Sequence, residues 1–307
     1  MKQEIAVRLL WTLGLIFMLA GAGVLGQWAL RGRTASQSRM GTRFAVEVGI
    51  LAGVWGPVYL GGPWLLAAVV VLLVLCTREL YGTLETGGDL PWKFSGMGLG
   101  VLVLLIVYRT PEAIDWIFPI GLVLYAGLRW AGLRFAGAGR PDSLLGRAQS
   151  TGLGLLYPGL CLAVFLALGL REAGFGYAIF FYGLAEANDV FAYLIGSSLG
   201  KRKIFPKLSP NKTLEGVLGG LLGAIGVGFA FAFAVPDFAP RDVVGAALLI
   251  GGAGLCGDLL ASRLKRRAGV KDYGDVIPTQ GGVLDVYDAF IFVAPVFYYY
   301  LEFTALR

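Results

Sequence analysis

The sequence predicts an all-α, polytopic integral membrane protein with about ten transmembrane helices. Apolar residues make up 57% of its 307 residues and charged residues only 15%, and the mean hydropathy is +0.72. A soluble domain carries about 25% charged residues, so this chain could not cover a water-facing surface. Several runs of roughly 17 to 25 mostly apolar residues are each long enough to cross a membrane as a helix.

Ten candidate spans follow one another, with ends that hydropathy places to within a few residues. They cover residues 8–30, 44–60, 63–77, 94–109, 113–128, 150–170, 174–198, 214–235, 242–261 and 286–305. The second and third spans are short and share a turn at Gly61-Gly62-Pro63. Since no linker separates a second domain, we expect residues 1–43 to add one helix and a basic loop to a single membrane-embedded domain, residues 44–307.

Basic residues fall unevenly on the two sides of the membrane. The connections on one side hold only Lys2, Arg8, Arg109, Arg171, Arg241 and Arg307, which leaves 20 of the 26 Lys and Arg residues on the other. The positive-inside bias places the basic loops in the cytoplasm and both termini outside, and a bacterial plasma membrane is the simplest location. The net charge of +6 therefore reflects topology, and nucleic-acid binding is not needed to explain it.

The first span has an alternative interpretation as a cleaved signal peptide. Lys2 and Arg8 precede an apolar run, and Ala20-Gly21-Ala22 offers the small residues of a cleavage site. Cleavage would leave a translocated loop that carries four arginines, against the charge rule. A retained anchor that enters from outside is therefore favoured.

Two absences limit the chemistry. The chain has no histidine, which excludes histidine metal sites, Ser-His-Asp hydrolysis and imidazole bases. Its three cysteines, Cys76, Cys161 and Cys256, lie in apolar runs and are expected to be packing residues without a disulfide framework. Any reaction must rest on carboxylates, cations and metals bound by oxygen.

Acidic residues are few within or beside the spans. They are Glu47, Glu186, Asp189, Asp258, Asp285 and Asp288. An ionisable group at membrane depth costs at least about 2.5 to 3.5 kcal/mol, so each needs a partner or a function. Asp285 and Asp288 share one face at the start of the last helix, at the positive end of its dipole. Helix capping would explain one carboxylate, but a pair beside Gly281-Gly282 and several cations predicts a divalent-cation site.

Asp258 is expected at the cytoplasmic end of the preceding helix, where the dipole disfavours a carboxylate. It needs a compensating positive charge, which a shared Mg²⁺ would supply.

The loop 200–216, GKRKIFPKLSPNKTLEG, is the second polar segment. Its ammonium groups and hydroxyls, and the backbone N–H groups of a helix that should begin at Thr213, suit phosphate oxygens. It lacks the GxxxxGK[ST] spacing of a P-loop, and a positive-inside loop with two turns is the other interpretation. Before it, Asp189, Tyr193 and Gly196 follow one helical stripe.

Together these segments put a cationic cradle and an acidic metal site on one membrane face. Phosphorus chemistry depends on charge neutralisation and in-line positioning, so the residues predict transfer of a phosphoryl or nucleotidyl group at a lipid headgroup. A transporter is disfavoured because the polar groups crowd one face.

The two segments resemble those of the phosphatidate cytidylyltransferases, also called CDP-diacylglycerol synthases, over about residues 45–305. The family's C-terminal signature is matched at Ser262, Lys265-Arg266, Lys271-Asp272, Pro278, Gly281-Gly282, Asp285 and Asp288. A second block is matched at Asp189, Ala192-Tyr193, Gly196, Gly200-Lys201, Ser209-Pro210-Asn211-Lys212-Thr213 and Glu215-Gly216. The chain departs from the signature at Gln280, where the family has His, and at Val286, where it has Arg.

The resemblance implies a membrane enzyme that joins CTP and phosphatidate into CDP-diacylglycerol and pyrophosphate for phospholipid synthesis. Asp258, Asp285 and Asp288 would bind Mg²⁺, with K⁺ as an option beside it, and would act in catalysis with Lys212 and Lys265. The implied substrate-binding residues are Asp189, Lys201, Ser209, Asn211, Arg266, Lys271 and Gln280. Expected partners are CTP, a lipid phosphate and membrane lipids, with a homodimer as an option and without nucleic acid.

The departures affect substrate handling more than fold. A phosphate monoester is largely ionised near pH 7, so its attack needs no general base and the loss of His at Gln280 is tolerable. At Val286 a guanidinium is replaced by an alkyl group, and Arg263 or Arg267 could substitute for it. Two alternatives stay open: a CTP-dependent kinase of a polyisoprenoid or other lipid alcohol, with a carboxylate such as Asp189 as base, and a catalytically silent lipid-binding scaffold.

Overall fold

The computed structural model describes residues 2–9, 35–134, 140–206, 208–278 and 280–305. Helices dominate this part of the chain, and its only β-bridges are the isolated pairs Lys203–Thr213 and Ile277–Gly281. The longer helices are α2 (Ala35–Leu60), α3 (Gly62–Thr86), α4 (Lys93–Arg109), α5 (Ile114–Arg134), α6 (Leu144–Gly154), α7 (Cys161–Leu170), α8 (Gly174–Leu199), α9 (Leu214–Ala230), α10 (Pro240–Arg267) and α11 (Val283–Ala305). The predicted span 8–30 lies outside the described residues except for its first two, so the retained anchor stays a prediction, as does the division at residues 43–44.

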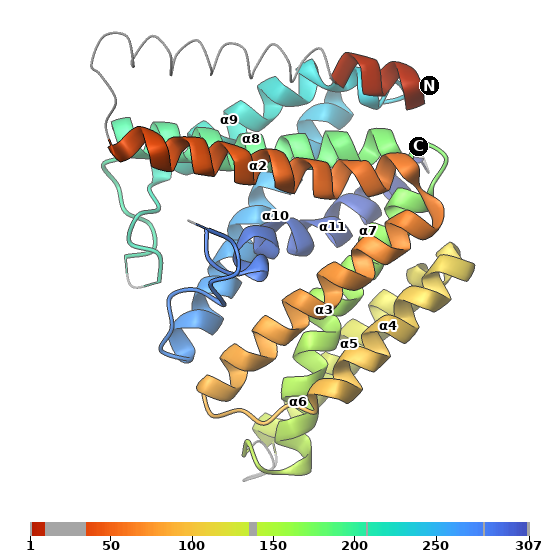
Figure 1. Ribbon diagram of the computed structural model, residues 1–307, viewed down its shortest axis with the longest axis vertical. Coiled ribbons are helices and arrows are strands. Elements are labelled where there is room, and N and C mark those ends of the chain that lie inside the picture. The colour runs from red at the N-terminus through yellow and green to blue at the C-terminus, as the bar shows by residue number, and fades with distance from the viewer. Residues whose placement is uncertain (1, 10–34, 135–139, 207, 279, 306–307) are drawn as a thin grey trace.

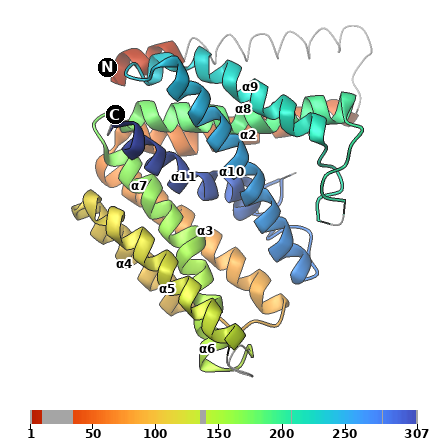
Figure 2. The same ribbon diagram turned by 180° about the vertical axis from the view of Figure 1, so that it is seen from behind.

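The helices form two groups joined by the last pair. Helices α2, α8 and α9 cross one half of the molecule, α3 to α7 run through the other half, and α10 and α11 lie between them (Figures 1 and 2). The loops that follow α8 and α10 lie close together at one end, away from the end of α11. This arrangement brings the two polar segments of the sequence to the same place.

Among the described residues, six helical segments are long and apolar enough to cross a membrane. They are Gly62–Thr86, Pro111–Arg134, Leu144–Leu170, Gly174–Leu199, Pro240–Arg267 and Val283–Thr304. Two shorter apolar helices are Val48–Leu60 and Leu214–Ala230. The predicted all-α, polytopic membrane fold is therefore confirmed.

Several helix ends differ from the predicted spans. The third span was expected to end at residue 77, but α3 continues to Thr86 and ends only where Gly87 and Gly88 follow, with Gly88 at a φ of 89°. Charged residues ended the hydropathy pattern there, yet they are good helix formers and do not end the helix. The span 150–170 is broken by the π-helical turn Leu155–Leu160, in which Tyr157 has non-helical backbone angles.

Glycines and aromatic rings set the packing around the polar end. A Cβ on Gly196 of α8 would lie 3.4 Å from the Cα of Gly216 on α9, so these two helices approach closely. In the core, Phe181 of α8 stacks on Phe297 of α11 with ring centroids 5.6 Å apart, and Phe290 lies 4.8 Å from Phe181. These contacts fix the axis of α11 and thereby the position of its N-terminal turn.

Candidate active site

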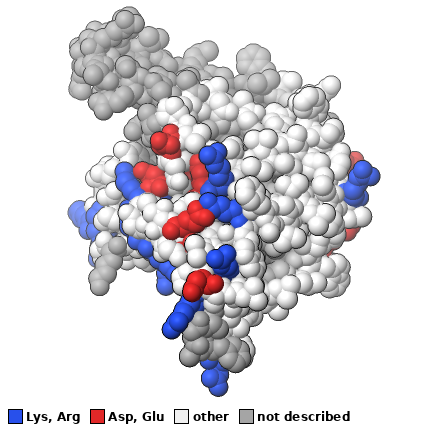
Figure 3. All heavy atoms as spheres, turned by 60° about the horizontal axis from the view of Figure 1, so that its bottom comes forward, with Lys and Arg blue, Asp and Glu red and all other residues white. Residues whose placement is uncertain are grey.

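Charged side chains gather over one part of the face formed by the loop end (Figure 3). Two ion-paired clusters contain the predicted aspartates, one between the start of α9 and α10 and one between α10 and α11. Each cluster contains one lysine and at least one predicted aspartate. The structure therefore brings together residues that the sequence placed in two separate segments.

The first cluster joins the basic loop to α10. Lys212 ends the loop, immediately before Thr213, whose hydroxyl caps α9 by accepting a hydrogen bond from the N–H of Gly216 at 3.1 Å. The Lys212 Nζ donates to Oδ2 of Asp258, and both side chains are partly exposed. The expected start of a helix at Thr213 is confirmed.

The expectation that Asp258 ends its helix was wrong, because α10 continues for nine more residues to Arg267. The helix dipole acts only within the last turn, so it does not explain the need for a positive charge at Asp258. Partial burial explains it, and the Lys212 ammonium supplies the charge.

A polar cleft of about 340 Å³ opens beside this pair, between α8, α9 and α10. Asp189, Asn211, Lys212 and Asp258 line it, so four predicted site residues face one space. The Nδ2 of Asn188 donates to Oδ1 of Asp189 at 3.2 Å. The cleft presents one ammonium group and two carboxylates to whatever enters it.

The second cluster is more deeply buried. The Nζ of Lys265 lies 2.7 Å from Oδ1 of Asp285 and 3.8 Å from Oδ2 of Asp288, and the two carboxylate side chains are only 5% and 10% exposed. Removing one partner of such a buried pair leaves an uncompensated charge and costs about 3 to 5 kcal/mol. Lys265 also lies over the ring of Tyr273, 5.0 Å from its centroid.

Capping and ion pairing coexist at the start of α11. Oδ2 of Asp285 accepts hydrogen bonds from the backbone N–H groups of Tyr273, at 2.7 Å, and of Gly282, at 2.9 Å. The capping interpretation is thus correct for Asp285, while its other oxygen binds Lys265. Gly281 makes the turn possible, since its φ of 105° favours glycine.

Glu79 of α3 also contacts this turn, although no pattern in the sequence indicated it. Its two carboxylate oxygens accept from the N–H groups of Val283, at 2.9 Å, and Leu284, at 2.7 Å. The side chain thereby satisfies two N–H groups that a helix N-terminus leaves without partners. In the sequence, Glu79 is only an acidic residue two positions after the predicted end of a span. Nothing there indicates that its partner lies 204 residues away.

Two tyrosines support the same turn. The Tyr157 hydroxyl donates to the carbonyl of Asp288 at 3.1 Å, and the Tyr273 hydroxyl donates to the carbonyl of Ala261 at 3.3 Å. Burial, reinforced by the nearby carboxylates of Asp288 and Asp285, raises the pKa of Tyr273 well above its ordinary value. Tyr273 therefore acts as a neutral hydrogen-bond donor at any physiological pH.

Of the remaining predicted residues, Arg266 lies in the last turn of α10 and the others lie on the two loops. The N–H of Lys201 donates to Oε2 of Glu215, and Nη1 of Arg266 donates to the carbonyl of Val270. Ser209, Lys271 and Gln280 occupy the loop turns beside the two clusters: the carbonyl of Ser209 accepts from the N–H of Lys212, Lys271 is exposed and Gln280 is half-buried.

Val286 packs against the apolar core, and neither arginine offered as its substitute contacts the aspartates in the described part of the chain. Arg267 pairs with Asp89 at 3.6 Å instead.

The carboxylates fit Mg²⁺ in chemical kind, because aspartate oxygens are hard ligands of the type that this ion prefers. Their present partners are ammonium groups, Lys212 on Asp258 and Lys265 on Asp285 and Asp288. Within the described ranges, no three His, Cys, Asp or Glu side chains converge closely enough to hold an ion by themselves. Magnesium commonly completes its shell with water and substrate phosphates, and such oxygens would be needed here.

These features define a polytopic membrane protein with a charged Asp/Lys centre at one end of its helices. The profile of the Cytidylyltransferase family matches residues 41–304, nearly the whole chain. The chain therefore belongs to the Cytidylyltransferase family.

Individual relatives agree with this assignment. The chain is 30% identical to the Phosphatidate cytidylyltransferase of Staphylococcus aureus (strain COL) over 238 residues, which cover 76% of this chain and 88% of that one. It is 37% identical over 151 residues to the Phosphatidate cytidylyltransferase of Bacillus subtilis (strain 168), and 42% identical over 125 residues to the Uncharacterized protein YnbB of Escherichia coli (strain K12). The last two matches span 56% and 42% of those relatives, and 48% and 41% of this chain.

Proposed function

We propose that this protein transfers the cytidylyl group of CTP to phosphatidate, giving CDP-diacylglycerol and pyrophosphate for phospholipid synthesis. The observation that carries the proposal is the pairing of Lys212 with Asp258 in the cleft between α8, α9 and α10, together with the pairing of Lys265 with Asp285 and Asp288 between α10 and α11. A lysine ammonium group that is paired with a carboxylate can donate to phosphate oxygens instead when a phosphate binds. The negative charge of the phosphate competes with the carboxylate for the ammonium group. The names of the relatives support phosphatidate as the acceptor.

The chain's own residues would bind and orient the two phosphates. Lys212, on the loop that precedes α9, would hold the triphosphate in the cleft with Asn211 and the loop residues Lys201 and Ser209. Lys265 would hold the lipid phosphate at the start of α11. Arg266, Lys271 and Gln280 would close the loop side of the site. Asp189 would line the cleft and contact polar groups of the nucleotide.

In the bond-forming step, an oxygen of the lipid phosphate attacks the α-phosphorus of CTP. The bond from that phosphorus to the bridging oxygen of the β-phosphate breaks, and pyrophosphate leaves with the electron pair. The attacking phosphate monoester is already ionised near pH 7, so no residue has to remove a proton. Bound at Asp258, Asp285 and Asp288, Mg²⁺, with K⁺ as an option beside it, would neutralise charge on the reacting phosphates.

We propose further that the loops lie in the cytoplasm of a bacterium, where CTP is available, and that the acceptor comes from the plasma membrane. The excess of Lys and Arg on this side supports that orientation. A homodimer is compatible with the proposal and is not required by it.

A labelling experiment tests the reaction. Purified protein in detergent is given Mg²⁺, phosphatidate and CTP labelled on either the α- or the γ-phosphorus. We expect the α-label to enter the lipid and the γ-label to remain in water as pyrophosphate. Asp258→Asn should abolish the transfer, while Asp275→Asn, on the exposed loop, should not. With a polyisoprenoid alcohol supplied in place of phosphatidate, entry of the γ-label into that alcohol would instead establish a kinase, and no transfer of either label to either lipid would favour a scaffold.

A further inference from the structure

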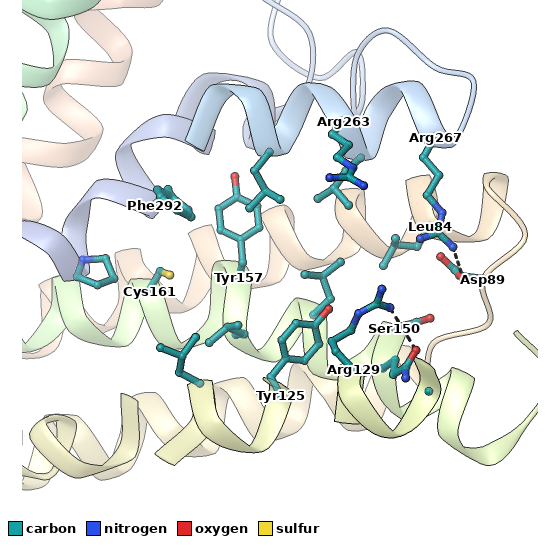
Figure 4. Close-up of a pocket in the computed structure, with 18 of the residues that line it drawn as sticks. Leu84, Asp89, Tyr125, Arg129, Ser150, Tyr157, Cys161, Arg263, Arg267 and Phe292 are labelled. Carbon is teal, nitrogen blue, oxygen red and sulfur yellow. Dashed lines mark hydrogen bonds and ion pairs between the residues drawn. The ribbon is translucent and has the colours of Figure 1, made fainter. Parts of the chain in front are cut away.

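A second cavity lies on the other side of α10 from the Asp258 cleft. It has a volume of about 910 Å³ and is lined by residues of α3, α5, α6, α7, α10 and α11 and of the π-helical turn (Figure 4). Arg263 and Arg267 follow Asp258 by five and nine residues, so they lie about 140° and 180° around the helix from it. Lys265, seven residues on, lies only about 20° from Asp258. One face of α10 therefore carries Asp258 and Lys265, and the opposite face carries the arginines that line this second cavity.

Arginine and apolar side chains occupy opposite ends of this cavity. Figure 4 shows Arg263 and Arg267 extending from α10 toward Arg129 of α5, whereas Phe292 and Cys161 lie at the far end. Phe118 also lines the apolar part and precedes Arg129 by eleven residues on the same helix. At 1.5 Å per residue these two positions are about 16 Å apart along the axis, close to half of the roughly 30 Å hydrocarbon core. The cavity thus has the length and polarity of one membrane leaflet.

The arginines carry charge that the protein does not neutralise. Among the described residues, Asp89 is the one carboxylate that lines the cavity, and Arg267 pairs with it at 3.6 Å. In the described residues, the one acceptor of Arg129 is the neutral amide oxygen of Gln149, at 3.2 Å. Within the described part of the chain, Arg263 has no ion pair or hydrogen bond. The cavity therefore contains three guanidinium groups and one carboxylate, which leaves two positive charges without a counter-charge at its polar end.

We propose that this cavity binds a membrane lipid whose headgroup is a phosphate monoester, with the phosphate between Arg129 and Arg263 and an acyl chain along the apolar wall. A phosphate monoester carries between one and two negative charges at neutral pH, which matches the unneutralised charge. Guanidinium groups bind its oxygens in a bidentate manner. The lipid would come from the bilayer, in the leaflet that the arginines face. This site is separate from the transfer centre and does not depend on turnover there.

Photo-crosslinking of the full chain tests the proposal. The protein is placed in phosphatidylcholine vesicles without CTP or Mg²⁺. The probe is a phosphatidate with a diazirine in one acyl chain, and the matched diacylglycerol lacks the phosphate. We expect the phosphatidate to label peptides within 118–133 and 292–299, and the diacylglycerol to label them far less. In Arg129→Gln/Arg263→Gln this labelling should fall about tenfold or more, the factor expected for loss of a charge-assisted hydrogen bond.

Two matched controls keep the result interpretable. Arg134→Gln, on the same helix but outside the cavity lining, should label as the unaltered protein does. Leu122→Trp fills the apolar end and should reduce labelling, whereas Leu124→Trp, two residues on and not part of the lining, should not. Equal labelling by both probes, or unchanged labelling in the double arginine variant, would overturn the proposal. Displacement of the probe by millimolar inorganic phosphate would assign the arginines to a free anion and also overturn it.

Discussion

The Lys265 cluster allows a quantitative prediction. We expect Lys265→Met and Asp285→Asn to be individually destabilising, and the double variant to be less destabilised than the sum of the two. At an effective dielectric constant of about 20, the distances of 2.7 Å and 3.8 Å from Lys265 to Asp285 and Asp288 correspond to about 6 and 4 kcal/mol of attraction before desolvation. After desolvation, a coupling of about 2 kcal/mol between Lys265 and Asp285 is expected, within the range of contacting pairs.

The chain offers its own reporter for this measurement. Cys76 and Cys161 are buried and Cys256 is exposed, so a thiol-reactive dye on a Cys256→Ser background reports unfolding. Unfolding is followed against increasing SDS for the reference protein, the two single variants and the double variant. Asparagine at position 285 can still accept the backbone hydrogen bonds at the start of α11, so the cycle isolates the charge. Strictly additive effects, with a coupling below about 0.5 kcal/mol, would refute the reasoning.

Three smaller predictions use the same unfolding assay or a titration. Glu79→Gln should cost about 1 kcal/mol, because it removes a negative charge from a helix N-terminus, whereas Glu85→Gln, at an exposed pair, should change stability by less than about 0.5 kcal/mol; equal effects would contradict the capping role. Tyr273 should not ionise below about pH 10, because its pKa is raised. Ultraviolet titrations of the unaltered protein and of Tyr273→Phe should therefore coincide up to that pH. A difference between the two titrations below about pH 10 would contradict the burial of the phenol. Gly196→Leu should destabilise by about 1 to 3 kcal/mol or more through overpacking against α9, while Gly226→Leu, where a Cβ meets nothing within 4 Å, should be tolerated; the reverse order would contradict the close packing.

Local patterns predicted the elements of the site well. The acidic pair at the start of α11 and the helix start at Thr213 follow from spacing and capping rules that act within one turn. The membrane fold follows from composition, since the number of charged residues excludes a soluble surface.

The partners of the carboxylates were not predictable in the same way. Asp258 pairs with Lys212, 46 residues away, and no local pattern indicated that partner, while the shared Mg²⁺ stays a prediction. Glu79 reaches α11 only because α3 continues beyond its apolar run. Hydropathy indicates where the apolar, lipid-facing part of a helix ends. The helix itself can continue beyond that point, as α3 does to Thr86. Long-range contacts such as that of Glu79 depend on the end of the helix and not on the end of the apolar run.

The proposed transfer centre depends on Lys212, which would donate hydrogen bonds to a phosphate in the cleft. Replacing this lysine tests the proposal most directly. The measurement is the kcat for cytidylyl transfer from CTP to phosphatidate by Lys212→Met and by Lys203→Met. Lys203 belongs to the same loop, and its Nζ donates to the carbonyl of Asn211 at 3.5 Å. We predict that Lys212→Met lowers kcat by about 10²- to 10³-fold, as expected for removal of one preorganised donor, and that Lys203→Met changes it little. Equal rates in the two folded variants would contradict the account.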